Sequence, residues 1–393
     1  MRRVLWILAG AVVLLAVTGL IGSGWYYSNQ LLPAASPSDP VYEIDVLDVR
    51  DDVITLDLTG ASEDYEEVDL TTDGIFGFET TSGYLHLTDV VDVSGDRVQR
   101  RYVAIEGTAA EDVRGEIQAY AYPDDPGVLG REFDEVVVAG PLGDYPAWRF
   151  PADGDDWVVF VHGRGATLAE PLRAVDHVVS SGVNALVITY RNDPDAPASP
   201  DGHGHFGDSE WEDLAAAVDW LVGEEDVDDL VLWGYSQGGS VVASYLRRGD
   251  VPDEVVGAVL DSPILSMHGT LRLQAMNRGI PSALLGPILA SATTISELRS
   301  SIDFGRLEHV EAADEFSLPI LLFHGRGDTS VPFEPAQKFA AARKELVTFV
   351  PYDGDHVRGW NVDNERYLDA VTAFLRGTTE VAQVSDSSVP SGL

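Results

Sequence analysis

The 393-residue chain contains no cysteine, and only two of its 25 basic residues, Lys338 and Lys344, are lysines. The lack of cysteine excludes disulfide bonds, thiolate nucleophiles and metal sites built on cysteine. Acidic residues number 65, which gives a formal net charge of −40 at pH 7. A surface of that charge repels phosphate backbones and argues against nucleic acid as a partner. Apolar residues make up 45% of the chain, enough for a large domain and a smaller one.

An apolar, uncharged stretch follows Arg2 and Arg3 and reaches about Gly24. About 20 helical residues span a hydrocarbon core of ~30 Å, and arginines on the short N-terminal side favour its retention in the cytoplasm. The sequence therefore predicts that residues 1–24 form a single-pass anchor in the cell membrane, with the rest of the chain on the extracytoplasmic side. The alternative is a cleaved signal peptide and a secreted protein. The stretch is longer than a usual signal core, and no clear A-x-A cleavage site follows it.

The remaining chain divides by composition. Residues 25–40 contain three prolines and many small residues, which is typical of a linker. Residues 41–130 show short runs of period-two alternation separated by turns, which predicts a small β-rich N-terminal region. Residues 131–376 alternate strand-like and helix-like segments. The tail, 377–393, is rich in Ser, Thr and Val and is expected to be disordered.

The alternation within 131–376 predicts an α/β fold, with a mostly parallel, twisted sheet and helices on both faces. Ligands of such sheets bind at the carboxyl ends of the strands. One connection, about 262–316, is too long for a plain crossover and predicts a helical lid. The expected strands are 157–161, 184–190, 230–233, 255–260, 319–323 and 347–351. The expected helices are 168–180, 210–222, 239–247, 335–344 and 364–376.

Ser236 lies in Gly234-Tyr235-Ser236-Gln237-Gly238, between an apolar strand-like run and a helix-like segment. A strand, a sharp glycine-flanked turn and a helix are the context that a nucleophile elbow requires. The turn holds the hydroxyl above the sheet, and the helix N-terminus behind it favours negative charge. Ser236 is therefore the candidate nucleophile.

A serine hydroxyl needs a base, and His356 follows the last expected strand, where such a base should emerge. Asp328, in Gly325-Arg326-Gly327-Asp328, follows the strand before it and could orient the imidazole. Two other carboxylates remain open as the acid. Asp261 ends an expected strand, and Asp355 is adjacent to the histidine in sequence.

These motifs, in the chain order Ser, Asp, His, resemble the α/β-hydrolase superfamily over about residues 134–376. The similarity is greatest to its lipid-esterase and serine-aminopeptidase-like branches. The resemblance implies an oxyanion hole made by the backbone N–H groups of Gln237 and Arg164. Arg164 lies in the turn His162-Gly163-Arg164-Gly165, which departs from the HGGG run of some esterases.

Two other groups of residues compete for a functional interpretation. His203 and His205, near Asp201 and Asp208, have ligand chemistry suited to a metal, but no third histidine stands at a fixed spacing. A loop at the edge of the site is the simpler interpretation. Arg191 follows an expected strand and could contact a substrate carboxylate.

The resemblance implies a serine hydrolase that cleaves carboxylic esters of lipids or small acyl groups and needs no metal or organic cofactor. Apolar residues of the lid, which include Met267, Leu271, Met276 and Leu284, are expected to line an acyl pocket, and the alternative is ordinary helix packing against the domain. A serine peptidase or an acyltransferase would use the same three residues. A binding protein that has lost activity is a further alternative.

Overall fold

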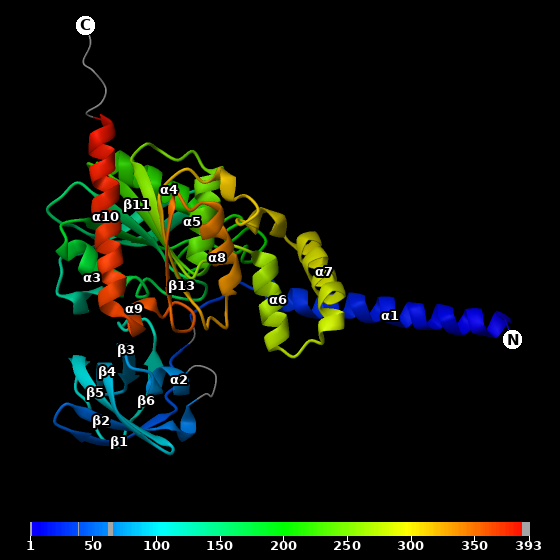
Figure 1. Ribbon diagram of the computed structural model, residues 1–393, viewed down its shortest axis with the longest axis horizontal. Helices are drawn as coiled ribbons and strands as arrows, with labels where there is room; N and C mark the ends of the chain where they lie inside the picture. The colour runs from blue at the N-terminus through cyan, green and yellow to red at the C-terminus, as the bar shows by residue number, and fades with distance from the viewer. Residues whose placement is uncertain (1, 38, 62–65, 387–393) are drawn as a thin grey trace, which may run out of the picture.

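A computed structural model describes residues 2–37, 39–61 and 66–386 of the chain. It begins with one long helix, α1 (Arg2–Leu31), whose N-terminal part extends away from the rest of the molecule (Figure 1). Within the described residues, α1 is the one helix long and apolar enough to cross a membrane. Two folded units follow, a β-barrel and a larger α/β unit.

The β-rich region is a closed antiparallel barrel in the order β1-β2-β5-β4-β3-β6. Alternating apolar residues of its strands fill the interior, as the period-two pattern predicts. The buried guanidinium of Arg100 donates to the carbonyl oxygens of Asp69 and Leu70 in the short helix α2 (Glu66–Thr71). The strands are β1 (Ile44–Arg50), β2 (Val53–Asp57), β3 (Phe76–Thr80), β4 (Gly83–Ser94), β5 (Arg97–Gly107) and β6 (Arg114–Gln118).

The larger unit is an eight-stranded sheet in the order β14-β13-β12-β11-β9-β10-β8-β7. The strands from β14 to β10 pair in parallel, and β8 pairs antiparallel with β10 and β7. The strands are β7 (Asp134–Gly140), β8 (Gly143–Phe150), β9 (Trp157–Val161), β10 (Asn184–Ile188), β11 (Leu230–Tyr235), β12 (Val255–Asp261), β13 (Ile320–Gly325) and β14 (Val347–Tyr352). This is the α/β-hydrolase fold that the sequence predicts.

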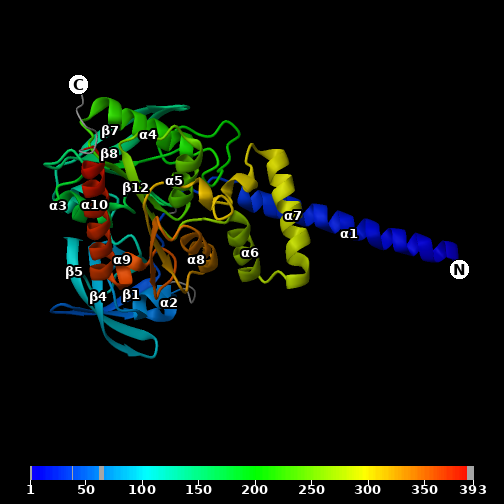
Figure 2. The ribbon, with the colours of Figure 1, turned by 45° about the horizontal axis from the view of Figure 1, so that its top comes forward.

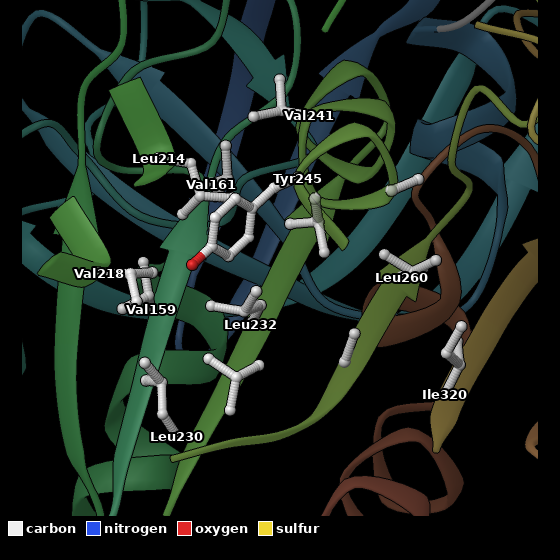
Figure 3. Close-up of a cluster of buried hydrophobic side chains, with 14 of the residues drawn as sticks. Val159, Val161, Leu214, Val218, Leu230, Leu232, Val241, Tyr245, Leu260 and Ile320 are labelled. Atoms are coloured by element: carbon white, nitrogen blue, oxygen red, sulfur yellow. The ribbon is translucent and has the colours of Figure 1, made fainter. Parts of the chain in front are cut away.

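Helices cover both faces of this sheet. The central strands β9 to β13 are buried along almost their whole length, so each face buries a separate cluster of side chains. Figure 3 shows part of one cluster, where Val159 and Leu232 of the sheet meet Leu214 and Tyr245 of the helices. That face carries α4 (Trp211–Glu224), α5 (Gln237–Arg248) and α8 (Phe333–Ala342), and the other carries α3 (Leu172–Ser180), α9 (Gly359–Val362) and α10 (Asn364–Asp386).

The long connection between β12 and β13 contains two antiparallel helices, α6 (Met267–Asn277) and α7 (Ser282–Arg299). The short helices η3 (Phe304–Leu307) and η4 (Ala313–Glu315) return the chain to the sheet. Figures 1 and 2 both show α7 lying beside the C-terminal part of α1. The connection therefore lies between the sheet and the long N-terminal helix.

The structure departs from two expectations. Residues 377–386, expected to be disordered, continue α10, because Thr378 is buried and its methyl group lies against β12 near Gly257. The rest of that tail, 387–393, lies outside the described residues. Residues 25–31, expected to begin a linker, complete α1, and Leu32 after them is only 1% exposed.

Candidate active site

Ser236 stands on a strained turn between β11 and α5. Its backbone has φ 49° and ψ −112°, a conformation that few non-glycine residues adopt. The neighbouring glycines are required by close contacts. A Cβ on Gly238 would lie 2.1 Å from the carbonyl oxygen of Val161, and one on Gly234 would lie 2.4 Å from that of Gly238. The strained turn therefore presents the serine side chain at the carboxyl end of the sheet, as an elbow requires.

The three candidate side chains come together in a hydrogen-bonded chain. The Nε2 atom of His356 lies 2.8 Å from Ser236 Oγ, and its Nδ1 atom lies 2.7 Å from Asp328 Oδ2. His356 stands just beyond β14, and Asp328 just beyond β13. Neighbouring parallel strands end at the same edge of the sheet, which explains how residues 120 positions apart meet there.

Asp328 is held as a charged acceptor. Its Oδ1 accepts from the backbone N–H groups of Ser330 and Val331, at 2.8 and 2.7 Å. Burial alone would raise the pKa of Asp328, but His356 and His324, whose Nε2 is 3.2 Å from Oδ2, hold that pKa well below its usual range. The carboxylate is therefore ionised throughout the neutral range.

The other two candidate acids have different partners. Asp261 is fully buried and accepts from the hydroxyls of Tyr367 and Ser262, at 2.8 and 3.1 Å. Asp355 accepts from the backbone N–H groups of Thr329 and His356. The carboxylate that bonds to the His356 ring is that of Asp328, not that of Asp261 or Asp355. The geometry therefore favours Asp328 over both.

The turn after β9 lies directly beside the serine. A Cβ on Gly163 would lie 3.3 Å from the Cβ of Ser236, so the two backbones are in close contact. The N–H of Gly163 is already used, because it donates to a carboxylate at 2.6 Å. Within the described residues, the backbone N–H groups of Arg164 and Gln237 have no recorded acceptor. These are the two amides that the resemblance implies for an oxyanion hole.

Two buried residues that sequence reasoning missed support this turn. Glu170 is the carboxylate that accepts from Gly163, and it pairs with Arg173 at 3.3 Å. Arg173 in turn donates to the carbonyl oxygen of Val357, the residue after His356. We call residues 162–165 the oxyanion turn, after their candidate role, and residues 353–358 around His356 the histidine loop. One ion pair thus braces both segments. The sequence did contain one signal for this pair, because two charged residues stand three positions apart at the start of an apolar helix.

The barrel also contacts the histidine loop. Arg358 donates to the carboxylate of Asp69 in α2, with a shortest distance of 2.8 Å. Asn361 donates to the backbone carbonyls of Ile75 and Ala119. The N-terminal unit therefore helps to hold His356, a role that its sequence pattern did not indicate.

The competing groups are occupied by structural contacts. His205 bonds to Asp201 and to Ser209, and no group of three or more metal-binding side chains occurs within the described residues. Arg191 is buried and makes a bidentate pair with Asp213, so it is not available to a substrate carboxylate.

The lid residues expected to line an acyl pocket divide into two sets. Met267 and Leu271 are buried in a cluster that also contains Leu32. Met276 and Leu284 are exposed, at 51% and 48%. The lid is thus packed against the chain that follows α1, and part of its apolar surface faces outward.

The sheet order, the strained elbow and the inserted helices define an α/β hydrolase. Residues 156–304, less than half of the chain, match the family model described as alpha/beta hydrolase fold, in agreement with the observed fold. The esterase Pf2001 of Pyrococcus furiosus shares this fold, with a TM-score of 0.53 at 22% identity over 65% of this chain and 96% of that one.

Curated relatives agree with this assignment. The chain is 23% identical to the uncharacterised protein YfhR of Salmonella typhimurium, over 66% of this chain and 88% of the relative. It is 25% identical to the lysophosphatidylserine lipase ABHD12 of Danio rerio, over 50% of this chain and 51% of the relative. The proteins that the chain resembles thus include an esterase and a lipase.

Proposed function

We propose that the chain is a membrane-anchored serine hydrolase that cleaves carboxylic esters, with its catalytic part on the extracytoplasmic side. The observation that carries the proposal is the hydrogen-bonded chain from Ser236 through His356 to Asp328. The lipase name of the zebrafish relative and the apolar α1 support a lipid or other acyl ester as the substrate.

In the proposed mechanism, Ser236 Oγ forms a bond to the ester carbonyl carbon while His356 Nε2 takes its proton. The carbonyl oxygen becomes an oxyanion, stabilised by the backbone N–H groups of Arg164 and Gln237. The carbon–oxygen bond to the alcohol then breaks, and the alcohol leaves with the proton from His356. Water then gives a proton to the same imidazole and attacks the acyl carbon, the bond from that carbon to Ser236 Oγ breaks, Ser236 Oγ takes the proton back from His356, and the acid leaves. Asp328 keeps the imidazole in the required tautomer throughout.

The test uses the full chain in detergent micelles and its Ser236→Ala variant. Both would be assayed with p-nitrophenyl esters from acetate to palmitate. Turnover that is lost in the variant supports the proposal, and the optimal chain length measures the acyl site. Turnover that is equal in the two proteins, or absent from both with no fluorophosphonate labelling of Ser236, would refute it.

A serine aminopeptidase is the second candidate, because a substrate amine would find carboxylates near the site. A cavity of about 750 Å³ between barrel and sheet borders Gly165 of the oxyanion turn. Its lining includes Glu79, Glu106 and Asp124. An aminoacyl p-nitroanilide panel distinguishes the two candidates, since a peptidase would turn over the anilides and an ester hydrolase would favour the esters.

A further inference from the structure

The segment that joins α1 to the barrel is packed into the hydrolase unit at its start. We call residues 32–36 the strap. Leu32 is 1% exposed and shares a buried cluster with lid residues and with Phe206. Its carbonyl oxygen accepts from the backbone N–H of Gly204 at 3.0 Å, and Pro33 forms a β-bridge with His203. A flexible tether would make none of these contacts.

The strap contacts the oxyanion turn directly. The Arg164 guanidinium donates to the carbonyl oxygen of Pro33 at 2.9 Å and lies over the ring of Phe206, 5.2 Å from its centre. The next residue, Gly165, has φ 70°, and a Cβ there would lie 3.2 Å from the Cβ of Ala35. The outer side of the turn therefore rests on the strap.

The inner side of the same turn is held by the protein core. Gly163 donates to Glu170 and lies against Ser236. The Arg164 amide, which the proposed mechanism uses, stands between the Glu170 contact on one side and the strap on the other. An oxyanion donor acts through its fixed position, and a small displacement costs much of its effect. Contacts on both sides restrict that displacement.

The strap's cluster also includes residues that hold the other catalytic candidates. Ile264 belongs to it, and its N–H donates to the carbonyl oxygen of Ser236 at 3.3 Å. Val331 belongs to it as well, and its N–H donates to Asp328 at 2.7 Å. The cluster that contains Leu32 thus also contains residues bonded to the Ser236 backbone and to the Asp328 carboxylate.

The helix that precedes the strap is fixed to the lid. Ser28 is fully buried, and its hydroxyl lies 3.0 Å from Ser296 Oγ and accepts from Arg299 at 2.8 Å. The same arginine lies over the ring of Trp25. The end of α1, the strap and the lid thus form one packed unit.

We infer that the strap positions the oxyanion turn, with Arg164 as the side chain that transmits the contact, so that the anchor is part of the catalytic unit. The inference rests on the proposed function, because it assigns a role relative to the Arg164 amide. A protein that begins after residue 40 lacks the strap and is expected to be a slower enzyme than the full chain.

The test uses the full chain in micelles and two kinds of change. In the first, residues 32–36 are replaced by Gly-Ser-Gly-Ser-Gly, which keeps the length of the strap and removes the buried side chain of Leu32. In the second, Arg164→Met removes the side-chain donor to the carbonyl oxygen of Pro33, whereas Arg164→Lys keeps a side-chain donor at that position. Arg101→Met, an exposed arginine of the barrel, is the matched control. The number of active sites in each protein is counted by complete fluorophosphonate labelling of Ser236 in a parallel sample, and rates are expressed per active site.

We expect Arg164→Met to lower kcat at least tenfold, which is less than the loss of about 10²–10³ that removal of one oxyanion donor costs, because the amide is displaced and not removed. KM should stay within threefold, Arg164→Lys should recover part of kcat, and the strap replacement should be at least as slow as Arg164→Met. The control should match the unmodified chain. A structural defect alone would reduce the number of labelled sites and leave kcat per site unchanged.

Three outcomes would overturn the inference. One is kcat per labelled site within twofold of the unmodified chain in both Arg164→Met and the strap replacement. Another is a rise in KM at constant kcat, which would make Arg164 a substrate contact. A third is failure of the unmodified chain itself to label or turn over, which refutes the proposed function first. If the strap replacement does not fold, the kcat values of Arg164→Met and Arg164→Lys alone test the inference.

Discussion

Replacing Glu170 by glutamine tests the buried ion pair beneath the oxyanion turn. The exposed fractions of Glu170 and Arg173 are 3% and 2%. Glu170→Gln keeps the shape and one acceptor oxygen for the N–H of Gly163, but it removes the charge that balances Arg173. The other recorded hydrogen-bond acceptors of Arg173 are uncharged, the backbone carbonyls of Ala119 and Val357 and the side chain of Asn361.

Removing one partner of a buried pair costs about 3–5 kcal/mol, because the remaining charge stays buried without compensation. We therefore expect Glu170→Gln to lower the free energy of unfolding by that amount. With about 2 °C per kcal/mol for a large domain, the melting temperature should fall by roughly 6–10 °C. The double variant Glu170→Gln/Arg173→Met removes both charges and should be more stable than the sum of the single losses predicts.

The assay is urea unfolding of the full chain in micelles, followed by tryptophan fluorescence. Glu334→Gln is the control, since Glu334 pairs with Lys338 on the exposed surface of α8 and should leave the transition unchanged. A loss below about 1 kcal/mol for Glu170→Gln would show that the variant does not leave an uncompensated charge on Arg173. Additive losses in the double variant would refute the coupling.

Three further predictions follow from the contacts. Asp328→Asn should lower kcat by about 10⁴ in the ester assay with little change in the melting temperature, because the amide favours the wrong histidine tautomer; an active variant would contradict it. Burial and two neighbouring arginines lower the pKa of His309 to about 3, so the unfolded chain binds a proton between about pH 6.5 and 3 that the folded chain does not. Stability should therefore fall as the pH drops through that window, by up to about 1.4 kcal/mol per unit, and His309→Gln should flatten the slope in urea titrations. A Cβ on Gly24 would lie 2.1 Å from a serine of α7, so Gly24→Leu should reduce disulfide formation between cysteines placed at Ser28 and Ser296 of this cysteine-free chain; an unchanged yield would show that α1 and α7 are not held together there.

The hydrolase fold was predictable because its signals are local. Each buried parallel strand is a short apolar run, and the turn around Ser236 carries the glycines that its φ of 49° and close contacts require. The positions of His356 and Asp328 followed from topology alone, since parallel strands bring their following loops to one edge. The choice among Asp328, Asp261 and Asp355 needed coordinates, because it depends on which carboxylate faces the imidazole.

The residues that support the site were not predictable, because their signals are not local. Glu170, Arg173 and Arg358 act through contacts between segments far apart in the chain, and a charged residue in sequence is usually a solvated one. The prediction for the strap was wrong for the same reason. Its prolines and alanines are typical of a linker, and only the fold reveals that the buried side chain of Leu32 and the carbonyls of the strap have partners in the hydrolase unit.

In the proposed membrane-anchored protein, the strap also helps to set the distance between the active site and the bilayer. The apolar, uncharged stretch of α1 ends at about Gly24, and the helix continues without interruption to Leu31. Seven residues at about 1.5 Å each place the start of the strap about 10 Å beyond the end of that stretch. Because Ser28 and Leu32 are packed in the body that holds Ser236, this spacing is fixed, whereas a tethered domain would move freely. A substrate whose ester stays near the bilayer surface matches such a fixed height, which favours membrane lipids over freely dissolved esters.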